Sequence, residues 1–219
     1  NRPLDFYNNV LKAFQDKDWR DVIFNADNLI KRFPSSPFTP ESYYYRGVAF
    51  YCLHDYDMAN HSFSNYLKNE ATPKFFEEAI EFKFKIGVKF KEGAKKHLLG
   101  FNRLPKIVPA KEEAIEIFDL VVTSLPRHDI AAEALYHKGS LLLIFRDYDA
   151  SVESFQTLIR RFPKHPLAPE GFLGIGKVYL NQTSQEFPDH DVLSLAEVNC
   201  EKFREAFPGE PRLQESITM

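Results

Sequence analysis

The side chains that could carry out chemistry are spread along the chain rather than grouped. The seven histidines stand at positions 54, 61, 97, 128, 137, 165 and 190. No two of them stand four residues apart beside a carboxylate partner, the signature that sets two metal ligands on one helix face. His190, between Asp189 and Asp191, could touch a cation, but this pattern is more typical of a turn at a helix start. No Ser, His and acid group stands out, so the sequence predicts no catalytic residue, no metal site and no enzymatic activity.

Glycines and cysteines also give no cofactor site. Gly171, Gly174 and Gly176 do not have the G-x-G-x-x-G spacing, and no strand precedes them. We interpret them as positions of close packing within a helix. Cys52 and Cys200 form neither a disulfide framework nor a zinc motif, and the sequence leaves open whether they pair. No cofactor is therefore predicted.

The densest charge lies in a basic stretch between residues 83 and 106. The basic stretch consists of Lys83, Lys85, Lys89, Lys91, Lys95, Lys96, Arg103 and Lys106. Only Glu92 opposes them, which gives a local charge of +7 in a chain whose net charge is −3. Because lysine is seldom buried without a partner, we expect most of these side chains to face water. The stretch is then either a solvated helix face with its loop, or a docking surface for an acidic protein or an anionic membrane. No nucleic-acid reading motif accompanies it, so nucleic acid is not an expected partner.

Two segments of the chain are near copies of each other. Residues 29–41 and 158–170 share the pattern Leu-Ile-x-Arg-Phe-Pro-x-x-Pro-x-x-Pro-Glu, and residues 125–133 are a weaker third copy. Trp19 and Tyr148 each stand 15 residues before the first proline of their copy. Apolar residues recur at helical spacing between the aromatic residue and the proline. Each copy is therefore predicted to be an amphipathic helix that ends at a proline-bearing turn.

A second recurring mark is an aromatic residue or Leu followed three positions later by Gly. It occurs at Tyr44–Gly47, Phe84–Gly87, Tyr136–Gly139 and Leu173–Gly176. Glycine within a helix costs about 1 kcal/mol relative to Ala, so a periodic one needs a reason. We expect that the partner helix approaches closely at these positions and that a Cβ atom would clash.

Together the two marks resemble the tetratricopeptide repeat: aromatic, small residue, aromatic, turn, Ala, Phe and Pro over about 34 residues. One clear copy consists of Leu135, Gly139, Leu142, Ser151, Phe155 and Pro163, with Ser151 where Ala is typical. The resemblance implies an all-α, right-handed superhelical solenoid of about five helix pairs, of which the third and fifth are enlarged. We expect one repeat domain over 1–219, with repeats near 3–36, 37–71, 72–127, 128–165 and 166–208 and a tail at 209–219. The expected helices are 4–15, 19–33, 40–53, 56–69, 74–97, 109–125, 129–145, 148–162, 168–182 and 190–207. The extra residues should form loops near 100–109 and 185–191.

Within this superfamily, the chain is most similar to the outer-membrane assembly lipoproteins of the BamD family. The similarity lies in the number of repeats, the Arg-Phe-Pro-x-x-Pro turns and the enlarged third repeat. It implies a protein-interaction scaffold in outer-membrane β-barrel assembly, at the periplasmic face of the bacterial outer membrane, with barrel precursors and the assembly machinery as partners. Membrane attachment would need a lipid anchor outside this sequence. The alternatives are the periplasmic accessory protein of the Tol–Pal system and a cytosolic chaperone or adaptor.

A solenoid of helix pairs has a concave groove lined by the first helix of each pair. Such a groove suits an extended peptide or a partner helix. By analogy with tetratricopeptide repeats, the groove should be lined by Glu41, Tyr44, Val48 and Tyr51 of repeat two and by Glu133, Tyr136, Ser140 and Leu143 of repeat four. For the tyrosines, packing in the core is an equally good interpretation.

Overall fold

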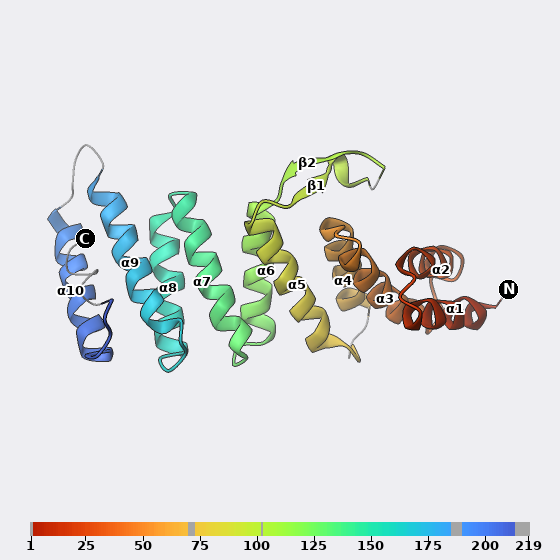
Figure 1. Cartoon of the computed structure of the whole chain (residues 1–219), viewed down its shortest axis with the longest axis horizontal. Coiled ribbons are helices and arrows are strands. Elements are labelled where there is room, and N and C mark those ends of the chain that lie inside the picture. Colours follow the sequence, from red (N-terminus) through yellow and green to blue (C-terminus); the bar gives the residue numbers. More distant parts are fainter. Residues whose placement is uncertain (1, 70–72, 102, 185–189, 213–219) are drawn as a thin grey trace. The chain divides into compact units, whose positions relative to one another are not determined.

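The computed structural model describes residues 2–69, 73–101, 103–184 and 190–212. The chain divides into two compact units, Asn1–Ile117 and Phe118–Met219. The described residues form ten α-helices, and within each unit helices that are consecutive in sequence pack side by side (Figure 1). The expectation of an all-α fold built from tandem helix pairs is confirmed.

The unit boundary falls within helix α6 (Lys111–Ser124). The first unit also contains α1 (Pro3–Gln15), α2 (Trp19–Arg32), α3 (Thr39–Cys52), α4 (Tyr56–Asn69), α5 (Phe76–Lys91), strand β1 (Lys95–His97), the short 3-10 helix η1 (Leu98–Gly100) and strand β2 (Lys106–Pro109). The second unit also contains α7 (Asp129–Ile144), α8 (Tyr148–Arg161), α9 (Ala168–Thr183) and α10 (His190–Ala206).

The two near-copies of the sequence form helices with matching ends. Helices α2 and α8 begin after Asp18 and Asp147, whose carboxylates accept hydrogen bonds from backbone N–H groups in the first turn, at 3.1 and 3.4 Å. Such an N-cap satisfies a donor that has no partner within the helix. Both helices end just before a Phe-Pro sequence, because proline lacks the N–H that the next helical hydrogen bond needs.

The periodic glycines lie where helices pack most closely. A Cβ atom on Gly47 of α3 would stand 2.9 Å from the ring of Phe63 in α4, and one on Gly139 of α7 would stand 2.9 Å from the ring of Phe155 in α8. A Cβ atom on Gly174 of α9 would stand 2.6 Å from the same Phe155 ring. The Phe155 ring is therefore held between glycines of both neighbouring helices. The prediction of close approach by the partner helix is confirmed at Gly47 and Gly139, and the close packing expected at Gly174 is confirmed as well; for Gly87 and Gly176 it stays a prediction.

Replacing either glycine that faces Phe155 should destabilise the second unit. Because the ring is confined from two sides, it cannot move away from a new methyl group, and overpacking of this kind usually costs about 1–3 kcal/mol. We expect Gly139→Ala and Gly174→Ala each to lower the midpoint of urea unfolding. Gly209→Ala is the matched control, since no atom lies within 4 Å of the added Cβ. Midpoints equal to that of the control would show that the glycines have no packing role.

The third helix pair differs from the prediction at the end of its first helix. The helix predicted over 74–97 ends at Lys91, and Gly93 adopts a φ of +108°, which side chains rarely allow. Residues 95–97 and 106–109 then pair as a two-stranded antiparallel hairpin in place of the predicted helix end and loop, with Lys95 opposite Pro109 and Lys96 opposite Val108. The described part of the predicted insertion thus contains paired strands. Its exposed apolar side chains are Leu99, Phe101 and Ile107.

Two other predicted features, the loop at 185–191 and the tail at 209–219, lie largely outside the described residues. Among the helices that the structure describes, none combines the length and the apolar character needed to cross a bilayer.

Candidate functional site

The structure places two of the predicted groove residues of repeat two in the core. Tyr44 and Val48 are only 8% and 6% exposed. The ring of Tyr44 stacks on Phe75 with 4.4 Å between centroids, and burial raises its pKa to about 12. Helix α3 contacts both α2 and α4, which leaves it little free surface. The prediction that Tyr44 and Val48 line an open groove is therefore wrong, and core packing is the correct interpretation.

The other two residues of this group also make contacts within the first unit. Glu41 accepts a hydrogen bond from the hydroxyl of Tyr7 in α1. Burial and this carboxylate raise the pKa of Tyr7. Tyr51 is half-buried and packs edge-on against Tyr56 and Phe82, with 5.5 and 5.2 Å between centroids. Both side chains keep some exposed surface, and their role in partner binding stays a prediction.

The groove residues of repeat four are all half-buried on α7. Tyr136 and Leu143 pack against the apolar cluster around Phe155. The Ser140 hydroxyl donates to the backbone carbonyl of Tyr136 at 2.9 Å, so its hydrogen is used within the helix. Glu133 lies about two turns before Ser140 on the same helix, with part of its surface open to solvent. Partner contact by this set remains a prediction.

Lys83 corrects the interpretation of the basic stretch. Its side chain is 3% exposed, and its ammonium group donates to Asn60 Oδ1 at 2.6 Å and to Ser64 Oγ at 2.8 Å. Asn60 in turn donates to Glu113 at 2.6 Å. Burial lowers the pKa of Lys83 to about 8. Lys83 is a polar link between α4 and α5 and cannot take part in a docking surface.

The other members of the basic stretch are exposed or half-buried. Lys85 lies over the Phe82 ring at 5.2 Å, and Lys89 pairs with Glu92 at 3.2 Å. Burial lowers the pKa of Lys91. The remaining four belong to the hairpin region: Lys95 and Arg103 are exposed, Lys96 pairs with Glu113, and Lys106 pairs with Asp55 at 3.2 Å. The run of charge in the sequence is therefore divided between an interior link, a helix surface and a hairpin.

The buried position of Lys83 predicts a pH dependence of stability. Its pKa is lower in the folded protein, about 8, than the ordinary value of 10.5. The unfolded chain then binds the proton more tightly, so folding becomes more favourable as pH rises from about 8 to 10.5 and levels off outside this range. Across this pH range, the free energy of unfolding of the wild type should rise by on the order of 3 kcal/mol relative to that of Lys83→Met, at about 1.4 kcal/mol per pKa unit.

Urea unfolding at several pH values in this range, for wild type and Lys83→Met, measures this gain. Lys85→Met controls for the loss of an exposed lysine from the same helix. A stability difference between wild type and Lys83→Met that stays constant with pH would contradict the burial of a charged amine.

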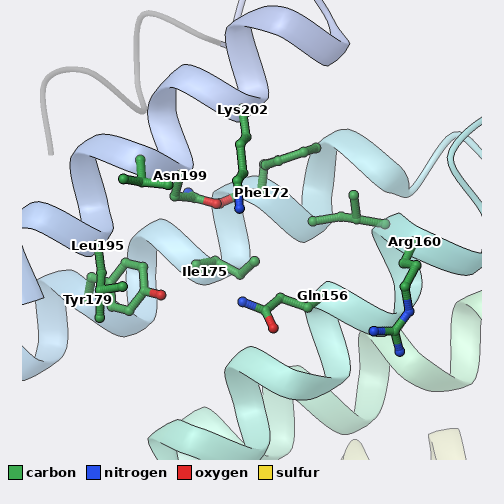
Figure 2. Close-up of a pocket in the computed structure, with 10 residues that line it drawn as sticks. Gln156, Arg160, Phe172, Ile175, Tyr179, Leu195, Asn199 and Lys202 are labelled. Carbon is green, nitrogen blue, oxygen red and sulfur yellow. The ribbon is translucent and has the colours of Figure 1, made fainter.

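A pocket that the sequence analysis missed lies between α8, α9 and α10 (Figure 2). Its volume is about 330 Å³. Its lining residues are Gln156, Ile159, Arg160, Phe172, Ile175, Tyr179, Leu195, Val198, Asn199 and Lys202. The side chains at its base are apolar and come mainly from α9, where the Pro169 start and the glycines bring the backbone close to α8.

The rim of the pocket carries charge and exposed apolar surface. The Lys202 side chain extends from α10 toward the opening, Gln156 extends from α8 on the other side, and the Arg160 side chain, also on α8, points away from Lys202 (Figure 2). Leu195 and Val198 of α10 are 50% and 44% exposed. A concave apolar surface with a few polar groups at its edge is the usual form of a binding site. This one favours a ligand with an apolar side chain and nearby negative charge.

The sequence contained only a weak signal for this pocket. Apolar residues of α9 that line it also belong to the core, since Phe172 and Ile175 are each no more than 5% exposed. Helix α10 carries neither the glycine mark nor the Arg-Phe-Pro turn. Its apolar residues at 195 and 198 could have indicated an uncovered face, but their exposure depends on how α10 packs against α9.

No family model matches the sequence, and no curated protein is significantly similar to it. Solved structures do resemble it. YrrB, described as a TPR protein with an unusual peptide-binding site, is 13% identical, with a TM-score of 0.53 over 100% of this chain and 93% of YrrB. MamA is 14% identical, with a TM-score of 0.53 over 97% of this chain and 94% of MamA. A tetratricopeptide repeat protein from Parabacteroides merdae is 15% identical, with a TM-score of 0.50 over 99% and 77%.

The chain has the tetratricopeptide-repeat fold. Its repeat signature has a clear physical basis in the copy at 135–163. Leu135, Leu142 and Phe155 are buried. Ser151 stands where Ala is typical, and its buried hydroxyl is satisfied because it donates to the carbonyl of Gly139 at 2.8 Å. The close contact between α7 and α8 at Gly139 brings the Gly139 carbonyl within reach of Ser151 on α8.

Proposed function

We propose that this chain is a scaffold for protein–protein interaction and that it binds a segment of a partner protein in the pocket between α8, α9 and α10. The observation that carries the proposal is the open apolar base of this pocket, flanked by two exposed cations, Arg160 and Lys202. An apolar side chain of the partner would enter the pocket and leave water. Burial of this kind supplies most of the binding energy in protein interfaces.

The charges at the rim indicate which segments would bind. Arg160 and Lys202 stand on opposite sides of the opening, on α8 and α10 (Figure 2). They would attract carboxylates on either side of the apolar anchor and disfavour basic segments, since like charges across an interface are repelled. The backbone groups of an extended segment could also bond to Gln156, whose amide both donates and accepts.

The chemistry of the lining favours binding over catalysis. Among the described residues that line the pocket there is no carboxylate, His, Cys or Ser. A nucleophile paired with a general base is therefore lacking at this site. The fold is shared with YrrB, whose description names a peptide-binding site, and this likeness supports the same class of ligand here.

A model peptide tests the proposal directly. The probe is a fluorescent, end-capped peptide with one Leu-Phe pair flanked on both sides by Glu, and its counterpart carries Lys in place of Glu. We expect the acidic peptide to bind more tightly. Arg160→Glu with Lys202→Glu should weaken its binding by about tenfold or more at low salt, because rim charges act through steering and complementarity.

Lys177→Glu is the matched charge control, since Lys177 is exposed on α9 and does not line the pocket. Leu195→Asp should instead weaken binding by removing apolar surface from the rim, and should do so at high salt as well. Equal affinity of both peptides for wild type and for the double variant would overturn the proposal.

We further propose that the scaffold works at the periplasmic face of the outer membrane in β-barrel assembly, in the manner of BamD. The Arg-Phe-Pro-x-x-Pro turns, the five helix pairs and the enlarged third pair support this proposal. Expression of the complete gene product in its own host, followed by fractionation of the cell envelope, tests the location. We expect it in the outer-membrane fraction together with the barrel-assembly machinery. Recovery from the cytosol would favour a chaperone or adaptor, and recovery with Tol–Pal components would favour the accessory protein of that system.

A further inference from the structure

A buried cluster of metal-ligating side chains lies where the hairpin meets the turn between α3 and α4. Asp55 and Asp57 come from that turn and from the first residues of α4, and His97 comes from the end of β1. A donor atom from each of the three lies within 4.8 Å of the others. His97 is 5% exposed and the Asp57 side chain 9%. The spacing rule used on the sequence could not detect this site, because 40 residues separate Asp57 from His97.

The two oxygens of Asp57 are used unequally. Oδ2 accepts the backbone N–H of His97 at 2.7 Å and faces the ring Nδ1 of His97, also at 2.7 Å. Oδ1 is buried and has no hydrogen-bond partner among the described residues. A buried carboxylate oxygen without a donor costs free energy, and native structures normally satisfy such groups with a proton, a water or an ion.

Asp55 adds a second incompletely satisfied carboxylate. Its Oδ1 is buried without a well-aligned hydrogen bond, although Lys106 Nζ lies 3.2 Å away and His97 Nδ1 lies 3.6 Å away. Burial and the neighbouring carboxylate of Asp57 raise the pKa of Asp55. Two carboxylates thus share one buried site, and Lys106, whose side chain is 37% exposed on β2, pairs with one of them.

We infer that Asp55, Asp57 and His97 form a binding site for a divalent transition-metal cation of the zinc class, which fastens the hairpin to α4. One imidazole with two carboxylates suits zinc, and three protein ligands leave a fourth position for water. Ligands about 2.1 Å from a tetrahedral ion stand about 3.4 Å apart. His97 Nδ1 lies 3.6 Å from Asp55 Oδ1, which is close to this spacing.

Binding would require small changes in the site. The ion would bind the lone pair of His97 Nδ1, any proton on that nitrogen would leave to solvent, and Asp57 Oδ1 would become a ligand. The backbone N–H of His97 keeps its bond to Asp57 Oδ2 and thereby orients the carboxylate from the outer shell. The ion would replace Lys106 as the partner of Asp55. The Lys106 side chain is exposed, so it can turn to solvent. The ion would thus join β1 and the start of α4, two segments that are far apart in sequence.

Zinc binding by the full chain tests this inference. After treatment with a chelator, the protein is dialysed against Zn²⁺ at neutral pH, and bound metal is measured by mass spectrometry. We expect one zinc per chain at this site. Asp57→Asn and His97→Gln should each weaken binding by about 10–100-fold or more, at least as much as the loss of an outer-shell partner. Lys106→Gln should strengthen it several-fold, because it removes the competing ammonium group. His61→Gln, on the exposed surface of α4, is the matched control.

A second measurement does not depend on stoichiometry. Zinc should raise the melting temperature of the wild type and slow hydrogen exchange in residues 95–101 and 103–109, and should do neither in Asp57→Asn. That variant keeps an acceptor for the His97 N–H, so circular dichroism should show the same helix content. Two results would overturn the inference: zinc retained equally by wild type, Asp57→Asn and His97→Gln, or no zinc held by the wild type at micromolar free metal. Either would make the cluster an anchor of hydrogen bonds and ion pairs alone.

Discussion

The contact between an aromatic ring and a glycine of the neighbouring helix is the constraint on which the repeat packing depends. Phe63 lies against Gly47 in the first unit, and Phe155 lies against both Gly139 and Gly174 in the second. A flat ring fills the interface only if the facing helix has no side chain at that point. The same contact brings backbone carbonyls close enough for Ser151 to reach one. Helix spacing, core volume and the side-chain hydrogen bond thus follow from a single pair of residue types.

Sequence patterns predicted the features that depend on local chemistry. The proline-bearing turns and the periodic glycines indicated the type and order of the helices, because each acts within one or two turns of the chain. The Lys83 link was not predictable in this way. Its partners, Asn60 and Ser64, lie on a different helix, and a lysine in a dense basic run gives no sign that it is buried.

The candidate sites were harder to predict than the helices. Tyr44 and Val48 had the spacing of groove residues, yet the helices on either side of α3 cover them. The pocket in the second unit depends on side chains from three helices, and the Asp55–Asp57–His97 cluster depends on a hairpin that the sequence presented as a helix end and a loop. Such sites result from contacts between segments far apart in the chain. Periodicity within one segment carries no information about them.

The hairpin at 95–109 also bears on how a repeat protein acquires new parts. Its first and last residues, Lys95 and Pro109, are paired across the two strands, so the chain leaves the helical layer and returns to nearly the same point. Such an excursion adds no net displacement between α5 and α6. The flanking helices therefore need not shift to accommodate it, and the hairpin can lengthen, shorten or change in composition while their own packing is kept. An insertion at this point of the repeat array can therefore change the surface of the protein while the packing of the helices is kept.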